Sequence, residues 1–204
     1  MQAPRCRLRN LRREEWGENV IIADADYVDR VAFDLTVNFE RMLMRRVPGA
    51  DLARWIDCVA LDGGVREGGG DTRVVLLHDS GKAAMENFVP AGYDGEISGK
   101  AFRDSLGEFV LTAVEIPQIS DKDSTLLELV QIVAARPEVK RIMVVPDTEG
   151  SDIYDRLRRL LSSCGDDKRV TLFAMQPMPG GNFRQEILGY SLMNALGIKG
   201  EELG

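Results

Sequence analysis

The chain alternates short apolar runs with segments in which apolar residues recur every three or four positions. Residues 19–23 form a short run rich in β-branched side chains. In the next segment apolar residues recur at helical spacing, beginning with Val28 and Val31. This pattern predicts a strand that leads directly into a long amphipathic helix, and Pro48 predicts where the helix has ended.

The same alternation continues to the C-terminus. Further strands are predicted at 58–61, 73–77, 109–116, 141–145 and 170–175, the last being the final strand. Helices are predicted from Asp51 through Trp55 and after Ser120, Ser151 and Asn182. Poor periodicity predicts an irregular insertion at about 80–100, which is a candidate lid, followed by one helical turn at 101–106.

Repeated strand and helix units with near-continuous apolar strands predict an α/β fold. We expect a mostly parallel sheet with helices on both faces, in three α/β/α layers. The length of 204 residues and the lack of a visible linker predict a single domain over residues 19–204. Residues 1–18, which carry five Arg before Glu14, are predicted to be a disordered or docked basic tail, or an arm that touches RNA or a partner.

Composition narrows the classes of function. The net charge of −7 argues against broad electrostatic binding of nucleic acid, although a local basic groove remains compatible with it. The three Cys are scattered and have no zinc or disulfide spacing, which predicts reduced thiols in the cytoplasm. No apolar run approaches the length of about 18 residues that a membrane span needs, so no membrane partner is expected.

Acidic residues follow several of the predicted strands. In open parallel sheets ligands bind beyond the carboxyl ends of the strands. Carboxylates gathered there suit Mg²⁺ or Mn²⁺, which is the cofactor we expect. The alternative is that Asp occupies turns and helix N-termini for local reasons, because it accepts hydrogen bonds from free N–H groups. The residues concerned are Asp24, Asp26, Asp62, Asp79, Asp147, Glu149 and Asp152.

Two segments resemble the PIN and NYN group of Mg²⁺-dependent ribonucleases. They are Asn19-Val-Ile-Ile-Ala-Asp24 and Arg141-Ile-Met-Val-Val-Pro-Asp147 with Asp152 after it. The resemblance implies a PIN/NYN-like fold in which Asp24 and Asp147 are metal ligands and Asp152 is the later acid. Asp121 or Asp123 would be the acid that opens the middle helix. The Asn that this group places shortly after the first Asp is absent.

The run Ile22-Ala-Asp24-Ala-Asp26 also resembles the first motif of haloacid dehalogenase-like phosphatases, an alternative Rossmannoid fold. By this resemblance Asp24 is a nucleophile that becomes phosphorylated, and Asp26 is the general acid and base. Asp147 and Asp152 fit the late acidic motif of that family, and Ser80 and Lys122 stand in for its middle motifs. A helix is predicted directly after Asp26, where that family has a hairpin flap.

Most of the chain also resembles an uncharacterised family of small Bacteroidetes-type bacterial proteins, through segments such as Tyr27-Val-Asp-Arg-Val-Ala-Phe-Asp34. That resemblance implies no activity. A weaker prediction is an anion site at Asn182 and Arg184, at the start of the expected last helix. His78, the only His, is expected to be structural.

Two functions follow as hypotheses. The first is a Mg²⁺- or Mn²⁺-dependent phosphoryl-transfer hydrolase that acts on RNA or a phosphorylated small molecule. Its catalytic residues would be Asp24, Asp26, Asp147 and Asp152, with Asp24, Asp147 and Asp152 on the metal. The second is a non-catalytic regulatory or scaffolding protein. It would dimerise through the last helix, whose small residues, such as Gly189 and Ala195, permit close packing either within the core or across a dimer.

Overall fold

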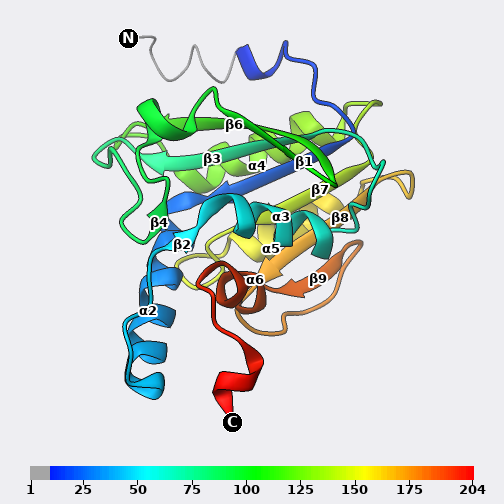
Figure 1. Cartoon of the computed structure of the whole chain (residues 1–204). Helices are drawn as coiled ribbons and strands as arrows, with labels where there is room; N and C mark the ends of the chain where they lie inside the picture. The colour runs from blue at the N-terminus through cyan, green and yellow to red at the C-terminus, as the bar shows by residue number, and fades with distance from the viewer. Residues whose placement is uncertain (1–9) are drawn as a thin grey trace.

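Buried apolar strands lie side by side at the centre of the molecule (Figure 1). The computed structural model describes residues 10–204, and within them seven strands form the main sheet. These are β1 (Asn19–Asp24), β3 (Thr72–Asp79), β5 (Ala101–Asp104), β6 (Gly107–Ile116), β7 (Arg141–Val145), β8 (Arg169–Ala174) and β9 (Arg184–Ile187). Their order is β5-β6-β3-β1-β7-β8-β9, and only the β5/β6 pair is antiparallel. The predicted mostly parallel α/β fold is confirmed.

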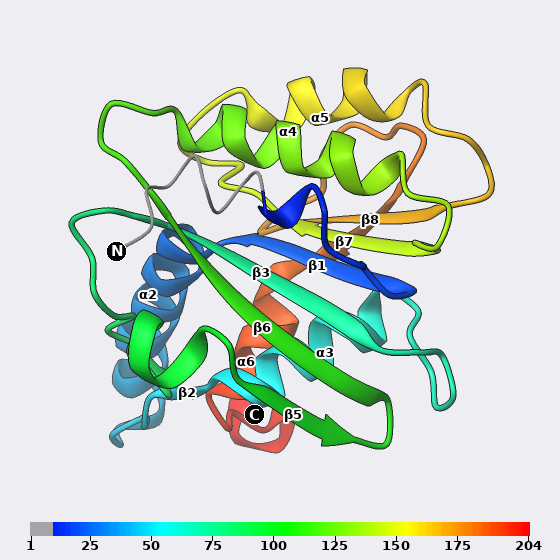
Figure 2. The ribbon, with the colours of Figure 1, turned by 90° about the horizontal axis from the view of Figure 1, so that it is seen from above.

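Helices cover both faces of this sheet, as Figure 2 shows. The α-helices are α2 (Ala25–Leu43), α3 (Leu52–Asp62), α4 (Lys122–Ala134), α5 (Ile153–Leu161) and α6 (Leu188–Ala195). The first core, between the sheet and α2, α3 and α6, includes Trp55 and Phe173. The second core lies beneath α4 and α5 and includes Leu129 and Leu157. Apolar side chains on both faces of each central strand explain why these strands read as continuous apolar runs.

Shorter elements complete the described chain. A two-stranded sheet pairs β2 (Ala50–Asp51) with β4 (Phe88–Val89). A π-helix, η1 (Tyr93–Ile97), lies in the segment between β3 and β5, and a 3₁₀-helix, η2 (Gly200–Leu203), ends the chain. Leu11 and Trp16 are buried in the second core, so this part of the basic N-terminal segment packs on the domain. Residues 1–9, with Arg5, Arg7 and Arg9 of the predicted basic tail, lie outside the described residues.

Two local predictions are wrong. Residues 58–61, expected as a strand, are the end of α3, because Trp55, Ile56, Val59 and Ala60 form one buried helical face. A short apolar run does not distinguish the two structures. Residues 101–106, expected as a helical turn, begin a hairpin with β6. Its turn ends at Gly107, whose φ of +117° is a conformation that few other residues adopt.

The C-terminal part differs from the prediction as well. Residues 184–187, expected to open the last helix, form strand β9, so β8 is not the final strand. β9 pairs in parallel with β8, from Thr171 opposite Arg184 to Ala174 opposite Ile187. This pairing satisfies backbone groups of β8 that an edge strand would leave open. The helix α6 begins only at Leu188.

The strand order creates one place where the direction of winding changes. Counted in chain order, the six parallel strands of the main sheet lie in the order 3-2-1-4-5-6. The first of them, β1, lies between β3 and β7, so successive connections turn to opposite sides of β1. Ligands of such sheets bind at this switch point, beyond the carboxyl ends of the strands. The chain segments that follow β1, β3 and β7 are therefore the first place to look for a site.

Candidate functional site

Asp24 ends β1 and caps the helix that follows it. Its Oδ1 accepts a hydrogen bond from the backbone N–H of Tyr27 at 3.1 Å, so the carboxylate satisfies a free donor of the first turn of α2. Because the six residues of β1 are all buried, the strand holds this carboxylate in the protein interior, where its side chain is only 3% exposed. The predicted position of Asp24 at a strand end is confirmed.

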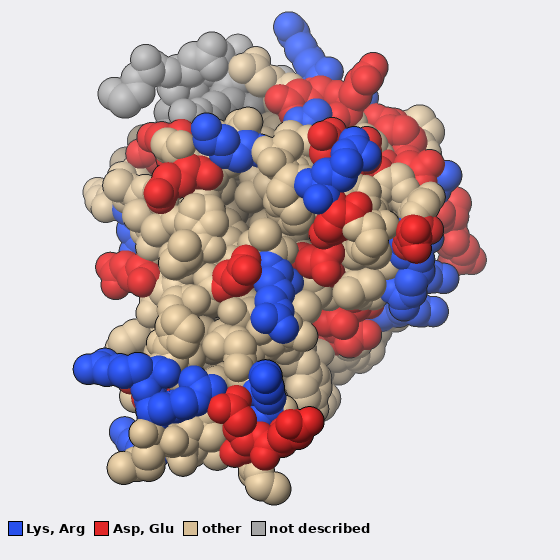
Figure 3. Space-filling model, in the orientation of Figure 1, with Lys and Arg blue, Asp and Glu red and all other residues tan. Residues whose placement is uncertain are grey.

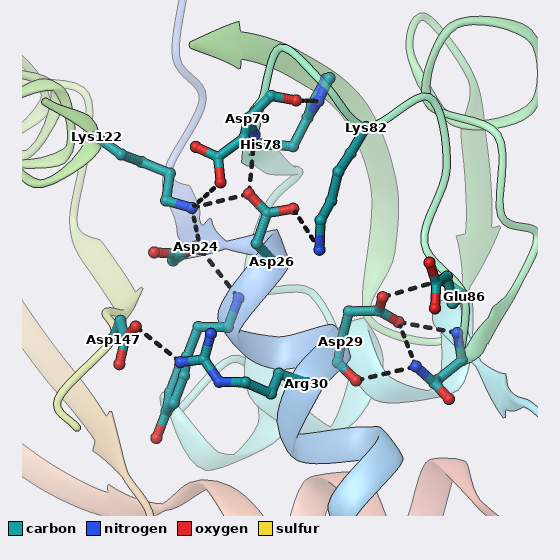
Figure 4. Close-up of polar contacts among 12 residues, drawn as sticks. Asp24, Asp26, Asp29, Arg30, His78, Asp79, Lys82, Glu86, Lys122 and Asp147 are labelled. Atoms are coloured by element: carbon teal, nitrogen blue, oxygen red, sulfur yellow. Dashed lines mark hydrogen bonds and ion pairs between the residues drawn. The ribbon is translucent and has the colours of Figure 1, made fainter. Parts of the chain in front are cut away.

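Lys122 joins three acidic residues that come from different elements (Figure 4). It is the first residue of α4, and its Nζ lies 3.1 Å from Asp24 Oδ1 and 2.8 Å from Asp26 Oδ2. The same Nζ lies 3.3 Å from Oδ2 of Asp79, at the end of β3. The backbone N–H of Asp79 also donates to Asp26 Oδ2 at 2.8 Å. The carboxyl ends of β1 and β3 and the start of α4 therefore meet in one polar cluster.

The two carboxyl groups on Lys122 have different affinities for protons. Burial raises the pKa of Asp24 to about 6, although Lys122 acts in the opposite direction. Burial also acts to raise the pKa of Asp26, but the bond and charge of Lys122 outweigh it and lower that pKa. Both carboxylates in turn raise the pKa of Lys122 against the effect of its own burial. At neutral pH the cluster thus holds a firmly ionised Asp26, a cationic Lys122 and a more basic carboxylate on Asp24.

One oxygen of Asp26 and a second cation complete the cluster. Asp26 Oδ1 is buried and accepts no hydrogen bond from any residue that the structure describes. The ammonium group of Lys82 lies 3.8 Å from it, and this side chain is about half exposed. Lys82 therefore brings positive charge to the side of the cluster that faces solvent. The two ammonium groups thus offset part of the negative charge of Asp24, Asp26 and Asp79.

A stacked pair of aromatic rings lies behind Asp26. The rings of His78 and Tyr93 are parallel within 6°, with their centroids 3.8 Å apart. His78 Nδ1 faces the backbone oxygen of Asp79 at 3.2 Å, and burial lowers the pKa of the imidazole, so His78 is neutral at pH 7. This packing agrees with the structural role expected for His78.

The segment after β7 is tied to α2 by separate contacts. Arg30 Nη2 donates to Asp147 Oδ2 at 2.8 Å, and the guanidinium lies over the Tyr27 ring. The Tyr27 hydroxyl donates to Glu149 at 2.8 Å. Asp147 Oδ1 in turn accepts the backbone N–H groups of Glu149 and Gly150. Asp147 thus orders its own loop and pairs with Arg30, while Asp24 pairs with Lys122.

The hydroxyl of Tyr27 makes a contact that can be measured. Tyr27→Phe is expected to lower the free energy of unfolding by about 1.5–3 kcal/mol, because it removes a hydrogen bond to a charged group. The matched control is Tyr190→Phe, since Tyr190 is 70% exposed and its change is expected to cost less than about 0.5 kcal/mol. Urea unfolding of the two variants measures the difference, and equal effects would argue against this contact.

The residues predicted as metal ligands take different partners. Asp24 contacts Lys122, Asp147 contacts Arg30, and Asp152 is exposed at the start of α5, where its nearest cation is Arg156 at 4.0 Å. Within residues 10–204 no three His, Cys, Asp or Glu side chains are grouped so that they could hold a metal ion. The acids suggested for the middle helix also act locally, because Asp121 caps α4 and pairs with Ser124.

Two other predicted positions are wrong. Asp62 does not follow a strand but ends α3, next to Gly63, which packs on Met143 in the middle of β7. Asn182 and Arg184 do not open a helix, because Arg184 begins β9. The Asn182 side chain donates to the backbone oxygens of Leu161 and Cys164, at the end of α5. The helix N-terminus on which the predicted anion site depended is therefore not at these residues, and anion binding by Asn182 and Arg184 stays a prediction.

The small residues of the last helix are used inside the chain. Gly189, Ser191 and Ala195 are buried on α6, which packs against α3. Tyr190, in contrast, is exposed. Of the two packings expected for these small residues, within the core or across a dimer, the structure shows the first.

The sequence analysis identified the acidic residues of the cluster but did not predict that lysines lie among them. Lys122 entered only as a stand-in for a motif of the haloacid dehalogenase-like phosphatases. A signal was present, because a Lys at the first position of a helix is unfavourable for the helix dipole and calls for a nearby carboxylate. That signal does not say which carboxylate, since Asp24 and Asp26 precede Lys122 by almost a hundred residues.

Comparison with known proteins gives a family and no activity. Residues 13–203 match a family described as a family of unknown function, DUF6621. No curated protein and no solved structure matches the chain. No helix in residues 10–204 is long and apolar enough to cross a membrane. The expected resemblance to an uncharacterised family is confirmed, while the bacterial origin of that family stays a prediction.

Proposed function

Since the chain belongs to DUF6621, a family of unknown function, we propose from the geometry of its site that it transfers a phosphoryl group to water through a phosphorylated Asp24. The observation that carries this proposal is the position of Lys122 Nζ, 3.1 Å from Asp24 and 2.8 Å from Asp26. An Asp-x-Asp segment at the end of the first strand, bound by a Lys that opens a later helix, supports the resemblance to haloacid dehalogenase-like phosphatases. The substrate class is a phosphorylated small molecule.

Asp24 is the nucleophile of the proposal. Its Oδ1 is engaged by Tyr27 and Lys122, which leaves Oδ2 to attack phosphorus. The raised pKa of about 6 makes Asp24 more basic than an ordinary carboxylate, yet it is ionised above that pH. A new bond forms between Asp24 Oδ2 and phosphorus as the bond to the leaving oxygen breaks. That oxygen takes the electron pair of the broken bond and a proton from solvent, because Asp26 is already ionised.

Lys122 and Lys82 neutralise the charge that arrives. A phosphoryl group adds negative charge beside the carboxylates of Asp24 and Asp26, and without cations this approach is repulsive. The ammonium group of Lys122 is held in place by three carboxylates, so it needs little rearrangement during the reaction. Lys82, on the exposed side, is placed to contact the outer oxygens of the substrate.

Hydrolysis of the acyl phosphate regenerates Asp24. Water attacks phosphorus, the bond between phosphorus and Asp24 Oδ2 breaks, and its electron pair returns to the carboxylate. Asp26 takes the proton of the water through Oδ1, the oxygen that accepts no hydrogen bond in the described chain. Asp26 thus acts as the base of the second step.

No step of this proposal passes through a metal ion. The acids described here form no group of three that could hold one, and Asp147 and Asp152 have other contacts. A metal-dependent ribonuclease would need Asp147 to leave Arg30 and approach Asp24. Mg²⁺ is therefore a variable of the experiment and not part of the proposed chemistry.

The test is the binding of beryllofluoride, which mimics a phosphoryl group on a carboxylate. Wild-type protein is expected to bind it with saturation and to show a higher Tm, with or without added Mg²⁺. Asp24→Asn is expected to bind none. The matched control is Asp51→Asn, because Asp51 caps α3 as Asp24 caps α2, with its Oδ1 3.1 Å from a backbone N–H, but on the surface. Absence of binding to the wild type under both conditions, or equal binding by Asp24→Asn, refutes the proposal.

A non-catalytic regulatory or scaffolding role is the competing proposal. The observation in its favour is that the side chains of Asp24 and Asp26 are 3% and 7% exposed and already neutralised by Lys122. In that case the cluster only joins β1, β3 and α4. It predicts neither beryllofluoride binding nor turnover, so the same titration separates the two proposals.

A further inference from the structure

A second polar site lies at the opposite end of the strands, where β7, β8 and β9 begin. A cavity of about 480 Å³ opens there to solvent. Five basic side chains line it, those of Lys140, Arg141, Lys168, Arg169 and Arg184, against the acids Asp166 and Asp167. Figure 3 shows Lys and Arg side chains beside Asp and Glu at the right-hand edge of the molecule, which is where these strands start in Figure 1. The cavity has an excess of positive charge although the whole chain carries −7.

Two of these arginines are neighbours through strand pairing. Arg141 and Arg169 occupy paired positions of the parallel strands β7 and β8, so their side chains leave the same face of the sheet. Paired strands lie only about 4.8 Å apart. Like charges in such positions repel each other and reduce the stability of the sheet. Fold stability alone therefore does not account for this pair.

The guanidinium groups in this cavity lack carboxylate partners. The Arg141 side chain makes one long contact, 3.4 Å to the amide oxygen of Asn19, and its buried Nε has no hydrogen-bond partner among the described residues. The side chains of Arg169 and Arg184 form no ion pair with any residue from 10 to 204. A buried donor without a partner costs stability, which a bound acceptor would recover.

The two lysines differ from the arginines in this respect. Lys168 Nζ donates to the backbone oxygens of Arg136 and Val139, and Lys140 Nζ pairs with Glu18 at 2.9 Å. They shape the wall of the cavity, while Arg141, Arg169 and Arg184 retain free donors. Planar guanidinium groups bind phosphate and carboxylate oxygens through two parallel hydrogen bonds, which an ammonium group does not do.

We propose that this cavity binds a small polyanion with two linked phosphoryl groups, through Arg141, Arg169 and Arg184. The volume lies within the range of about 300–1000 Å³ that is usual for small-ligand sites. Three arginines match the charge of a diphosphate group. The acids Asp166 and Asp167, which also line the cavity, disfavour a long polyanion that would extend past them. The site is separate from Asp24 and Lys122, because it lies where the strands begin and not where they end.

The experiment is a calorimetric titration of the full chain with inorganic pyrophosphate at low ionic strength. The test variant is Arg169→Gln/Arg184→Gln, and the control is Arg46→Gln/Arg103→Gln, which removes the same charge from two surface pairs with N–O distances of 3.7 Å. We expect the test variant to bind at least about tenfold more weakly than the wild type, and the control to bind as the wild type does. Inorganic phosphate is expected to bind more weakly than pyrophosphate to the wild type.

Three results would overturn the proposal. The first is that pyrophosphate does not bind the wild type. The second is that its affinity is unchanged in the test variant, which would place it elsewhere, including beside Lys122. The third is that a short single-stranded RNA binds more tightly than pyrophosphate with the same dependence on Arg169 and Arg184, which would assign the cavity to nucleic acid. Since both altered side chains are exposed, an unchanged Tm shows that the test variant remains folded.

Discussion

Asp24→Asn is expected to reduce the hydrolysis of p-nitrophenyl phosphate by about three orders of magnitude or more, because it removes the nucleophile of the proposed reaction. The fold should survive this change. Asn is as good a helix cap as Asp, and it keeps an oxygen for the N–H of Tyr27. Asp51→Asn, the matched change at the cap of α3, is expected to leave turnover unchanged. Turnover by Asp24→Asn at the wild-type rate would exclude Asp24 as the nucleophile.

The same variant is expected to alter the dependence of stability on pH. Burial raises the pKa of Asp24 from 3.8 to about 6, so the folded state holds this proton more tightly than the unfolded state does. The contribution of Asp24 to stability is therefore present below pH 4 and is lost as pH rises to about 6. The loss is of the order of 2–3 kcal/mol for a shift of this size.

Asp24→Asn cannot ionise and should lack this loss. Its free energy of unfolding at pH 7, relative to that at pH 4, is expected to exceed the corresponding wild-type difference. Urea unfolding at a series of pH values between 4 and 7 measures the effect, with Asp51→Asn expected to follow the wild type. If the free energy of unfolding depends on pH in the same way in Asp24→Asn and in the wild type, the pKa of Asp24 is not raised in the folded state. Reduced activity with undiminished stability is the pattern expected of a functional site.

Lys122→Met is expected to lower the free energy of unfolding at pH 7 by about 3 kcal/mol or more. It leaves the buried carboxylates of Asp24 and Asp26 without the cation that lies 3.1 and 2.8 Å from them. Loss of one partner of a buried ion pair costs more than loss of both, because the remaining charge is desolvated and unpaired. Lys100→Met is the control, since Lys100 is exposed and its change is expected to fall within about 0.5 kcal/mol of the wild type.

The cost of Lys122→Met should depend on pH and on Asp26. Asp26 has a lowered pKa in the presence of Lys122, so its stabilising charge is present above its ordinary pKa and lost as pH falls. Without Lys122 this benefit is gone, and protonation of the two acids makes the variant less unstable at low pH than at pH 7. Lys122→Met/Asp26→Asn should recover part of the stability at pH 7. A Lys122→Met variant as stable as Lys100→Met would show that the cluster does not hold the fold together.

The sequence determined the class of fold through local patterns. Continuous apolar runs predicted the central strands β1, β3, β6, β7 and β8, because strands covered on both faces expose neither side to water. Helical spacing of apolar residues predicted α2, α4 and α5, because a helix on the surface of a sheet buries only one of its faces. Asp24 was also placed correctly at the end of β1, since the acid follows the run and begins the next helical pattern. Each of these features depends on residues that are close in sequence.

Tertiary pairing decided what local patterns left open. Residues 184–187 became the strand β9 because β8 offered an unpaired edge, which outweighed their helical spacing. Residues 58–61 joined α3 because only a helix buries Trp55 and Val59 on one face. The pairing of β9 with β8 depends on a neighbour that a local pattern does not contain. The run 58–61, in contrast, is too short for its own pattern to distinguish a helix from a strand.

The candidate site, too, was predicted only in part from the sequence. The sequence by itself supplied the acids Asp24, Asp26 and Asp79 and placed them after strands. Only the tertiary structure shows that Lys122 lies between these acids. It also shows that Asp147 pairs with Arg30 and that Asp152 is exposed. The physical reason is that an ion pair depends on distance in space and on burial. Both are set by the packing of β1, β3 and α4, which no spacing along the chain records.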